Sequence, residues 1–155
     1  YLAQTSGIKV GVTRLTQVPT RWIDQGAWRV ISLARTPHRN LAGLIEVELK
    51  QFLSDRTDWR KMLVDAKSDD DLKAVADEVS GFLPDALSPY VSKSEEIVEL
   101  KYPVKSYPKK VTTLKLEDGP IRKKLTGIRG QYLYFDNNEV INLRKYSGYK
   151  VNVEV

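Results

Sequence analysis

A stretch rich in proline and serine, residues 84–94, divides this chain into two parts with different hydrophobic patterns. Before it, apolar residues recur at spacings of three and four in several segments, as in amphipathic helices. After it, short β-rich runs alternate with turn residues such as Gly, Asp and Asn. A chain of 155 residues is long enough for one compact domain or two small lobes, and we expect an α+β fold.

The N-terminal part begins with three short β-rich runs. Residues 1–4 and 8–13 flank a compact polar turn, which predicts a hairpin. Residues 17–25 predict a short helix that is capped at its C-terminus by Gly26. Residues 28–34 predict a third strand.

Three further helices are expected before the proline-rich stretch. Apolar residues at helical spacing follow Asn40, which we expect to be the N-cap of a helix that reaches Phe52. A short helix is expected at 58–63. Another is expected from Ser68 to Gly81, with acidic residues at its N-terminus; capping and solvation explain these acidic residues better than metal binding does.

Six short β-rich runs make up the rest of the chain, and closely spaced strands of this kind favour a small antiparallel barrel or curled sheet. They are residues 97–100, 111–116, 125–128, 131–135, 140–143 and 149–155. We therefore expect an N-terminal lobe at 1–63, an acidic helical connector at 64–96 and a small basic β-lobe at 97–155.

The charge of the chain is unevenly distributed. Basic residues outnumber acidic ones by 10 to 5 over residues 1–63 and by 12 to 5 over 101–155, whereas acidic residues outnumber basic ones by 10 to 3 over 64–100. Basic lobes favour a nucleic acid as partner, because each Lys or Arg that neutralises a phosphate releases counterions. An ordinary solvated surface explains the same charges equally well.

Other partners and compartments are constrained by what the sequence lacks. No apolar run approaches the roughly 20 residues that cross a bilayer, and no signal peptide is recognisable, so we expect a cytoplasmic protein that does not enter a membrane. The chain has no cysteine and a single histidine, His38, so any metal must be bound by oxygen atoms. Mg²⁺ or Mn²⁺ is then the expected ion. Because the chain begins at Tyr1 rather than at methionine, we expect it to be part of a longer protein.

Four residues in the first 46 have the chemistry of a phosphodiesterase. Glu46, on a predicted helix, is a ligand type for a divalent metal, and Arg21 has the planar fork that binds phosphate. Tyr1 and Lys9, on neighbouring hairpin strands, supply a hydroxyl and an amine for hydrogen bonding or proton transfer. Without further support, Glu46 is better explained as an exposed helical carboxylate that pairs with Lys50.

The order of these residues resembles two known families. Residues 1 to about 63 resemble the GIY-YIG endonuclease superfamily, whose core is a three-stranded antiparallel sheet flanked by helices. Nearly the whole chain is similar to the prokaryotic family DUF2797. The segments that are similar to that family are KVGVTR at 9–14, PTRWIDQGA at 19–27, LAGLIE at 41–46, LTGIRGQYL at 125–133, VINLR at 140–144 and SGY at 147–149.

The nuclease resemblance implies roles for individual residues. Tyr1 matches the tyrosine of the first motif, and Gly11 matches a glycine that lets the backbone approach the substrate. Arg21 matches the catalytic arginine, and Glu46 matches the single carboxylate that binds the metal. Lys9 departs from the pattern, because it stands where a second tyrosine is expected, and a protonated lysine is a poor base.

The tail contains a second candidate surface for nucleic acid. Tyr132 and Tyr134 share one face of a predicted strand, where their rings could stack on bases. The alternative is that both tyrosines pack inside the lobe. The basic residues that we expect to contact a phosphate backbone are Arg14, Arg122, Lys123, Lys124, Arg129, Arg144 and Lys145.

Two functions follow from these features. The first is a metal-dependent nucleic-acid phosphodiesterase with Tyr1, Lys9 and Arg21 as catalytic residues and Glu46 as the Mg²⁺ or Mn²⁺ ligand. The alternative is a nucleic-acid-binding module without catalysis on a degenerate nuclease scaffold. A protein-interaction role for the acidic helix is a third possibility, supported by charge alone. The sequence does not indicate an oligomeric state.

Overall fold

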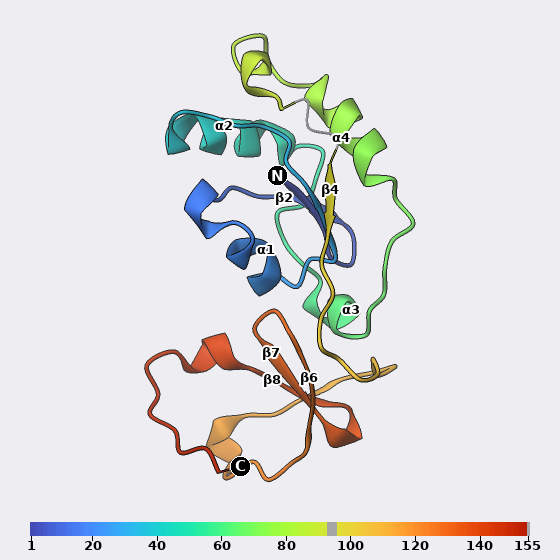
Figure 1. The fold of residues 1–155 in the computed structure, drawn as a ribbon, viewed down its shortest axis with the longest axis vertical. Coiled ribbons are helices and arrows are strands. Elements are labelled where there is room, and N and C mark those ends of the chain that lie inside the picture. Colours follow the sequence, from blue (N-terminus) through green and yellow to red (C-terminus); the bar gives the residue numbers. More distant parts are fainter. Residues whose placement is uncertain (93–95, 155) are drawn as a thin grey trace.

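The structure is a computed structural model, which describes residues 1–92 and 96–154. Within these residues the chain forms four α-helices and two four-stranded sheets, so the expected α+β class is confirmed. Figure 1 shows the first sheet with its helices as one lobe and the second sheet as another lobe near the C-terminus. No helix of the described residues has the length and apolar character needed to cross a membrane.

The first sheet has the strand order β2-β1-β3-β4, and all of its pairs are antiparallel. The strands are β1 (Leu2–Gln4), β2 (Ile8–Val10), β3 (Arg29–Ile31) and β4 (Ile97–Glu99). The predicted hairpin is confirmed, but the expected three-stranded sheet is wrong by one strand. β4 pairs with the otherwise open edge of β3, because this satisfies backbone groups that an edge strand leaves free. Residues 97–100, which we assigned to the C-terminal β-lobe, therefore contribute a strand to the first sheet.

The two faces of this sheet are covered by different helices. On one face, Leu2 and Ile31 belong to a buried cluster with Ile45 of α2 (Arg39–Leu49) and Ala76 of α4 (Leu72–Ser80). On the other face, Ala3, Val30 and Val98 pack with Trp22 of α1 (Thr20–Asp24). Figure 1 shows α1 and α4 on opposite sides of the sheet. Side chains alternate along a strand, so Tyr1, Lys9 and Gly11 share the face covered by α1.

The helix positions agree with the sequence patterns, but the predicted N-cap of α2 does not. α2 begins at Arg39, and His38 occupies the N-cap position without a side-chain hydrogen bond, so the prediction of Asn40 as the cap is wrong. The N-cap of α4 is Asp71, whose Oδ1 accepts from the backbone N–H of Lys73 and Ala74. Asp71 belongs to the acidic run for which capping was expected, and Ser68, which lies before it, accepts a hydrogen bond from Gln4 at 3.0 Å.

The short helices α1 and α3 (Trp59–Leu63) lie where they were expected. α1 ends before Gly26, which has a φ of +69° and therefore follows the helix in the left-handed conformation that glycine accommodates. Asp58 caps α3 by accepting from the N–H groups of Arg60 and Lys61.

The second sheet has the order β5-β8-β7-β6. Its strands are β5 (Thr112–Thr113), β6 (Leu125–Arg129), β7 (Tyr132–Phe135) and β8 (Glu139–Asn142). β5 and β6 are opposite edges and do not pair, so the described part of the sheet is open and the predicted barrel is not formed. The sheet is also not fully antiparallel, because β5 pairs with β8 in parallel. Residues 149–154, a predicted strand, have no regular secondary structure.

The two lobes meet at Arg129. Its Nε donates to the carbonyl of Gly26 at 3.1 Å, and its Nη1 forms an ion pair with Asp65 at 2.7 Å. The guanidinium also lies over the rings of Tyr102 and Tyr107, with separations of 5.3 and 5.4 Å from the ring centroids. The arginine side chain is fully buried by these contacts. One buried cation therefore joins the end of α1 to the second sheet.

Candidate functional site

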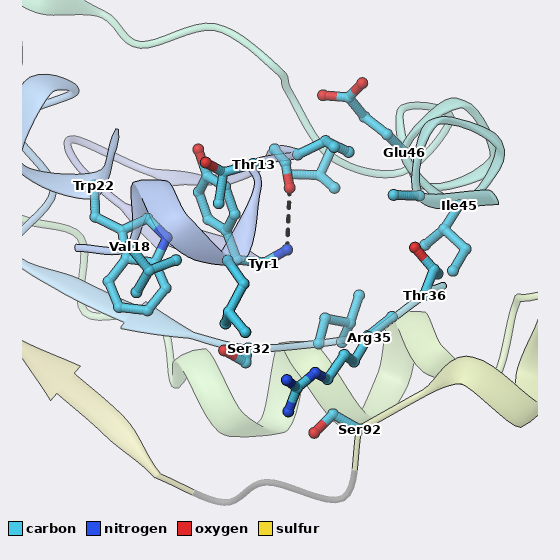
Figure 2. A pocket seen from close by; sticks show the side chains of 17 residues that line it. Tyr1, Thr13, Val18, Trp22, Ser32, Arg35, Thr36, Ile45, Glu46 and Ser92 are labelled. Carbon is cyan, nitrogen blue, oxygen red and sulfur yellow. Dashed lines mark hydrogen bonds between the residues drawn. The ribbon is translucent and has the colours of Figure 1, made fainter. Parts of the chain in front are cut away.

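Three of the predicted site residues of the first lobe line a cavity of about 520 Å³. Tyr1 and Gly11 line it from adjacent strands, and Glu46 lines it from α2. The chain that leaves β3, residues 32–36, forms much of the opposite wall. Figure 2 shows Tyr1 and the Glu46 carboxylate on one side of this space, with Arg35 and Ser92 on the other. We call this space the Glu46 cavity.

Tyr1 and Gly11 are fitted closely to each other. The Tyr1 backbone nitrogen donates to the Gly11 carbonyl at 3.0 Å (dashed in Figure 2), and the Gly11 N–H donates to the Tyr1 carbonyl at 3.0 Å. A Cβ at position 11 would lie 2.7 Å from the Tyr1 hydroxyl oxygen. Position 11 therefore needs glycine, because its backbone lies directly against the Tyr1 ring and leaves no space for a side chain.

The Tyr1 hydroxyl is oriented by its neighbours. It accepts a hydrogen bond from Gln25 Nε2 at 2.5 Å, and its ring lies 6.0 Å from that of Trp22. Burial raises the pKa of Tyr1, although hydrogen bonding to Gln25 and the charge of Arg21 oppose this shift. The phenol is thus protonated at neutral pH. Because its oxygen already accepts from Gln25, its own proton is free to be donated elsewhere.

Arg21 lies in a second cleft, of about 510 Å³, beside the Glu46 cavity. The two spaces share five lining residues, which are Val12, Thr13, Leu15, Thr36 and Ala42. They therefore form one continuous groove. Arg14, Arg39 and His38 also line the second cleft, which we call the arginine cleft.

Lys9 lies behind this groove rather than in it. Only 6% of its surface is exposed, and it lines neither space. Burial, together with a smaller effect from the charge of Arg21, lowers the pKa of Lys9 to about 8, and Asp55 acts in the opposite direction. The lysine is close enough to Arg21 to affect the charge of the site, but it does not reach the groove surface as a general base would.

Glu46 already has a partner. Lys50 Nζ lies 3.7 Å from its carboxylate and 3.1 Å from that of Asp55, so the pairing with Lys50 considered from the sequence is present. The carboxylate still lines the cavity, and about a quarter of its side-chain surface is exposed. No group of three or more metal-binding side chains (His, Cys, Asp or Glu) occurs in residues 1–92 and 96–154. A cation here would have Glu46 as its one carboxylate ligand from the protein. Mg²⁺ sites with a single protein carboxylate are common where water and phosphate oxygens supply the other ligands.

The residues predicted as a binding surface in the tail fall into two groups. Arg129 and Tyr134 are buried, and the Tyr134 hydroxyl donates to the Leu63 carbonyl at 3.1 Å. Tyr132 stacks on Trp59 with ring centroids 5.9 Å apart. These three residues join the lobes, so the two tyrosines pack at the interface between the lobes rather than inside the tail lobe, and Arg129 has no surface for a nucleic acid.

The other basic residues of the tail lie on the surface. Lys123 pairs with Glu139 at 2.6 Å, which leaves it partly neutralised. Of the predicted binding residues, the exposed ones without a carboxylate partner among the described residues are Arg122, Lys124, Arg144 and Lys145.

Sequence reasoning missed several residues of the groove. Thr36 and His38 line the arginine cleft from the connection between β3 and α2, Arg39 lines it from the start of α2, and Gln25 orients Tyr1. The cluster RTPHR at 35–39 was a usable signal, because a polar connection that leaves a sheet is a common position for binding residues. Gln25 had no such signal, since its role depends on where α1 packs.

The fold and the groove define a mixed α+β protein with a polar groove beside its first sheet. Residues 1–151 match the family described as "Protein of unknown function (DUF2797)", and the chain belongs to this family. No curated protein and no solved structure matches the chain.

Proposed function

We propose that the groove binds a nucleic-acid phosphodiester and hydrolyses it with a divalent cation at Glu46. The observation on which the proposal depends is that Tyr1, Gly11 and Glu46 line one cavity while Arg21 lines the adjoining cleft. The resemblance of residues 1 to about 63 to the GIY-YIG endonucleases supports the same assignment. The substrate is DNA or RNA.

Each residue then has a role that its surroundings support. Arg21 binds non-bridging phosphate oxygens through its planar fork and stabilises the charge that develops there. Tyr1 donates a hydrogen bond, because its own oxygen accepts from Gln25. Lys9 is buried near Arg21 and adds positive charge behind the phosphate without contacting it.

The cation is proposed on the chemistry of one side chain. Glu46 supplies a carboxylate oxygen, the hard ligand that Mg²⁺ and Mn²⁺ prefer, and it lines the cavity that would receive the phosphate. A bound cation would supply charge neutralisation in the transition state. Lys50 competes for the same carboxylate, and its ammonium must move for the cation to bind.

A cleavage assay tests this proposal. Labelled DNA and RNA, single- and double-stranded, are incubated with the protein in Mg²⁺ or Mn²⁺ and separately in EDTA. We expect metal-dependent cleavage that Glu46→Gln reduces by about a hundredfold or more, as expected for the loss of a metal ligand. Glu48→Gln is the matched control, because Glu48 is on the same helix but lines neither space. Equal cleavage by both variants, or no cleavage by the unmodified protein, would contradict the proposal.

A second candidate function is nucleic-acid binding without catalysis. It is favoured by Lys9, which stands in place of the expected second tyrosine, and by the pairing of Glu46 with Lys50. This function predicts binding that weakens with salt and is the same in EDTA and in Mg²⁺. Specific cleavage that depends on Glu46 would exclude it.

A further inference from the structure

Three arginines from three separate segments meet at the arginine cleft. Arg14 lies before the 3₁₀ turn Leu15–Gln17, Arg21 lies on α1, and Arg39 is the first residue of α2. No Asp or Glu lines the cleft. Within residues 1–92 and 96–154, no ion pair joins any of the three guanidinium groups to a carboxylate.

Two other arginines of the chain, in contrast, are paired with carboxylates. Arg29 is paired with Glu99 at 2.8 Å, and Arg129 is paired with Asp65 at 2.7 Å. Like charges that gather in a concave surface without counterions repel one another and concentrate positive potential there. An anion that enters the cleft would relieve this repulsion.

The guanidinium groups of the cleft indicate which kind of anion would bind there. A guanidinium presents its N–H donors in a fork that matches the oxygens of phosphate, and three such forks exceed what one simple monovalent anion needs. The N-terminus of α2 adds a smaller positive contribution at the same cleft, because its N-cap side chain makes no hydrogen bond. A phosphate group is therefore the ligand that fits this cleft.

We infer that Arg14 and Arg39 in the arginine cleft bind the phosphate next to the one that Arg21 and Glu46 hold, so that the ligand is a nucleic-acid strand rather than a single phosphodiester. The five shared lining residues place the two spaces side by side, and none of the five is charged. A strand presents phosphates at regular intervals and can occupy both spaces at once. This inference rests on the proposed function, which assigns the first phosphate to the Glu46 cavity.

Metal-free binding tests the inference. The anisotropy of a short fluorescein-labelled single-stranded oligonucleotide is followed in EDTA at about 50 mM salt, with inorganic tripolyphosphate as a competitor. We expect Arg14→Gln and Arg39→Gln each to weaken binding by about three- to tenfold and to lower the slope of log K against log salt by about one. Arg56→Gln is the matched control, since Arg56 is an exposed arginine of the same lobe that lines neither space.

The outcomes separate this inference from the proposed function. If Arg14→Gln and Arg39→Gln weaken oligonucleotide binding while no cleavage occurs in Mg²⁺, the phosphate subsite stands and the phosphodiesterase proposal fails. If cleavage depends on Glu46 but neither arginine affects binding, the subsite is contradicted and the phosphodiesterase proposal stands. Equal losses for Arg56→Gln, no binding by the unmodified protein, or tripolyphosphate that binds more tightly than the oligonucleotide would also overturn the subsite.

Discussion

Arg21 and Arg129 are both predicted phosphate-binding residues, yet the two lobes use them differently. Arg129 is fully buried, paired with Asp65 and enclosed by two tyrosine rings. Arg21 lines an open cleft and has no carboxylate partner within the described residues. The comparison shows that positive charge alone does not indicate a binding site. What distinguishes the two is whether the protein itself already supplies the counterion.

The tyrosines of the two lobes repeat this contrast. Tyr134 donates to a backbone carbonyl of the other lobe and is buried, so its hydroxyl has a structural role. The Tyr1 hydroxyl accepts from a side chain and retains a proton to donate at the cavity. We therefore expect substitutions in the second lobe to act mainly on stability, and substitutions in the groove to act mainly on binding.

The largest expected effect on stability is at Arg129. Arg129→Met keeps the volume of the side chain but removes the ion pair with Asp65 and the hydrogen bond to Gly26, so we expect unfolding free energy to fall by about 3 to 5 kcal/mol. Arg21→Met should change it by less than about 1 kcal/mol. Urea denaturation followed by circular dichroism measures both. Equal losses for the two variants would remove the distinction between the lobes.

The next effect concerns Lys9 and pH. The folded protein lowers its pKa to about 8, whereas an unfolded lysine has a value of about 10.4. Between these values the unfolded chain binds more protons than the folded one, so the contribution of Lys9 to the free energy of unfolding rises with pH. Below about pH 8 the buried charge costs up to about 3 kcal/mol.

Lys9→Met tests this cost. We expect the variant to be more stable than the unmodified protein at pH 7, by about 2 to 3 kcal/mol, and the difference to shrink as pH rises from 8 to above 10. Thermal or urea unfolding over this pH range measures the difference. A variant that is less stable at pH 7, or a difference that is independent of pH, would show that Lys9 is paired rather than desolvated.

The smallest of these effects is at Tyr134. Tyr134→Phe removes a buried hydroxyl and leaves the Leu63 carbonyl without that donor, so we expect a loss of about 1 kcal/mol. Tyr149→Phe, which changes an exposed tyrosine of the same lobe, should have almost no effect. A loss at Tyr149 as large as that at Tyr134 would indicate that the interface contributes little.

Local patterns predicted much of the fold. The spacing of apolar residues gave α2 and α4, and the turn at 5–7 gave the first hairpin, because these signals act between near neighbours in sequence. The pairing of β4 with β3 joins residues about 70 positions apart, and no local pattern encodes it. The alternation in β7 predicted that Tyr132 and Tyr134 share a face, but which face is buried depends on where the first lobe packs.

The site was predictable to a similar extent. Residue types and order suggested Tyr1, Arg21 and Glu46, and the structure places them around one groove. The burial of Lys9 was not predictable, because it follows from the packing of α1 over that face of the sheet and of the segment near Ser54 along β2. Arg39 was missed because its contribution depends on how α2 is oriented.

The most direct test compares charge-matched variants of the two lobes. Arg21→Gln with Arg39→Gln removes two charges from the groove, and Arg144→Gln with Lys145→Gln removes two charges from the exposed surface of the tail. Oligonucleotide binding is measured by fluorescence anisotropy in EDTA at low salt. Our account predicts a loss of about tenfold or more for the groove variant and less than about threefold for the tail variant. The reverse order would show that the tail, and not the groove, binds the nucleic acid.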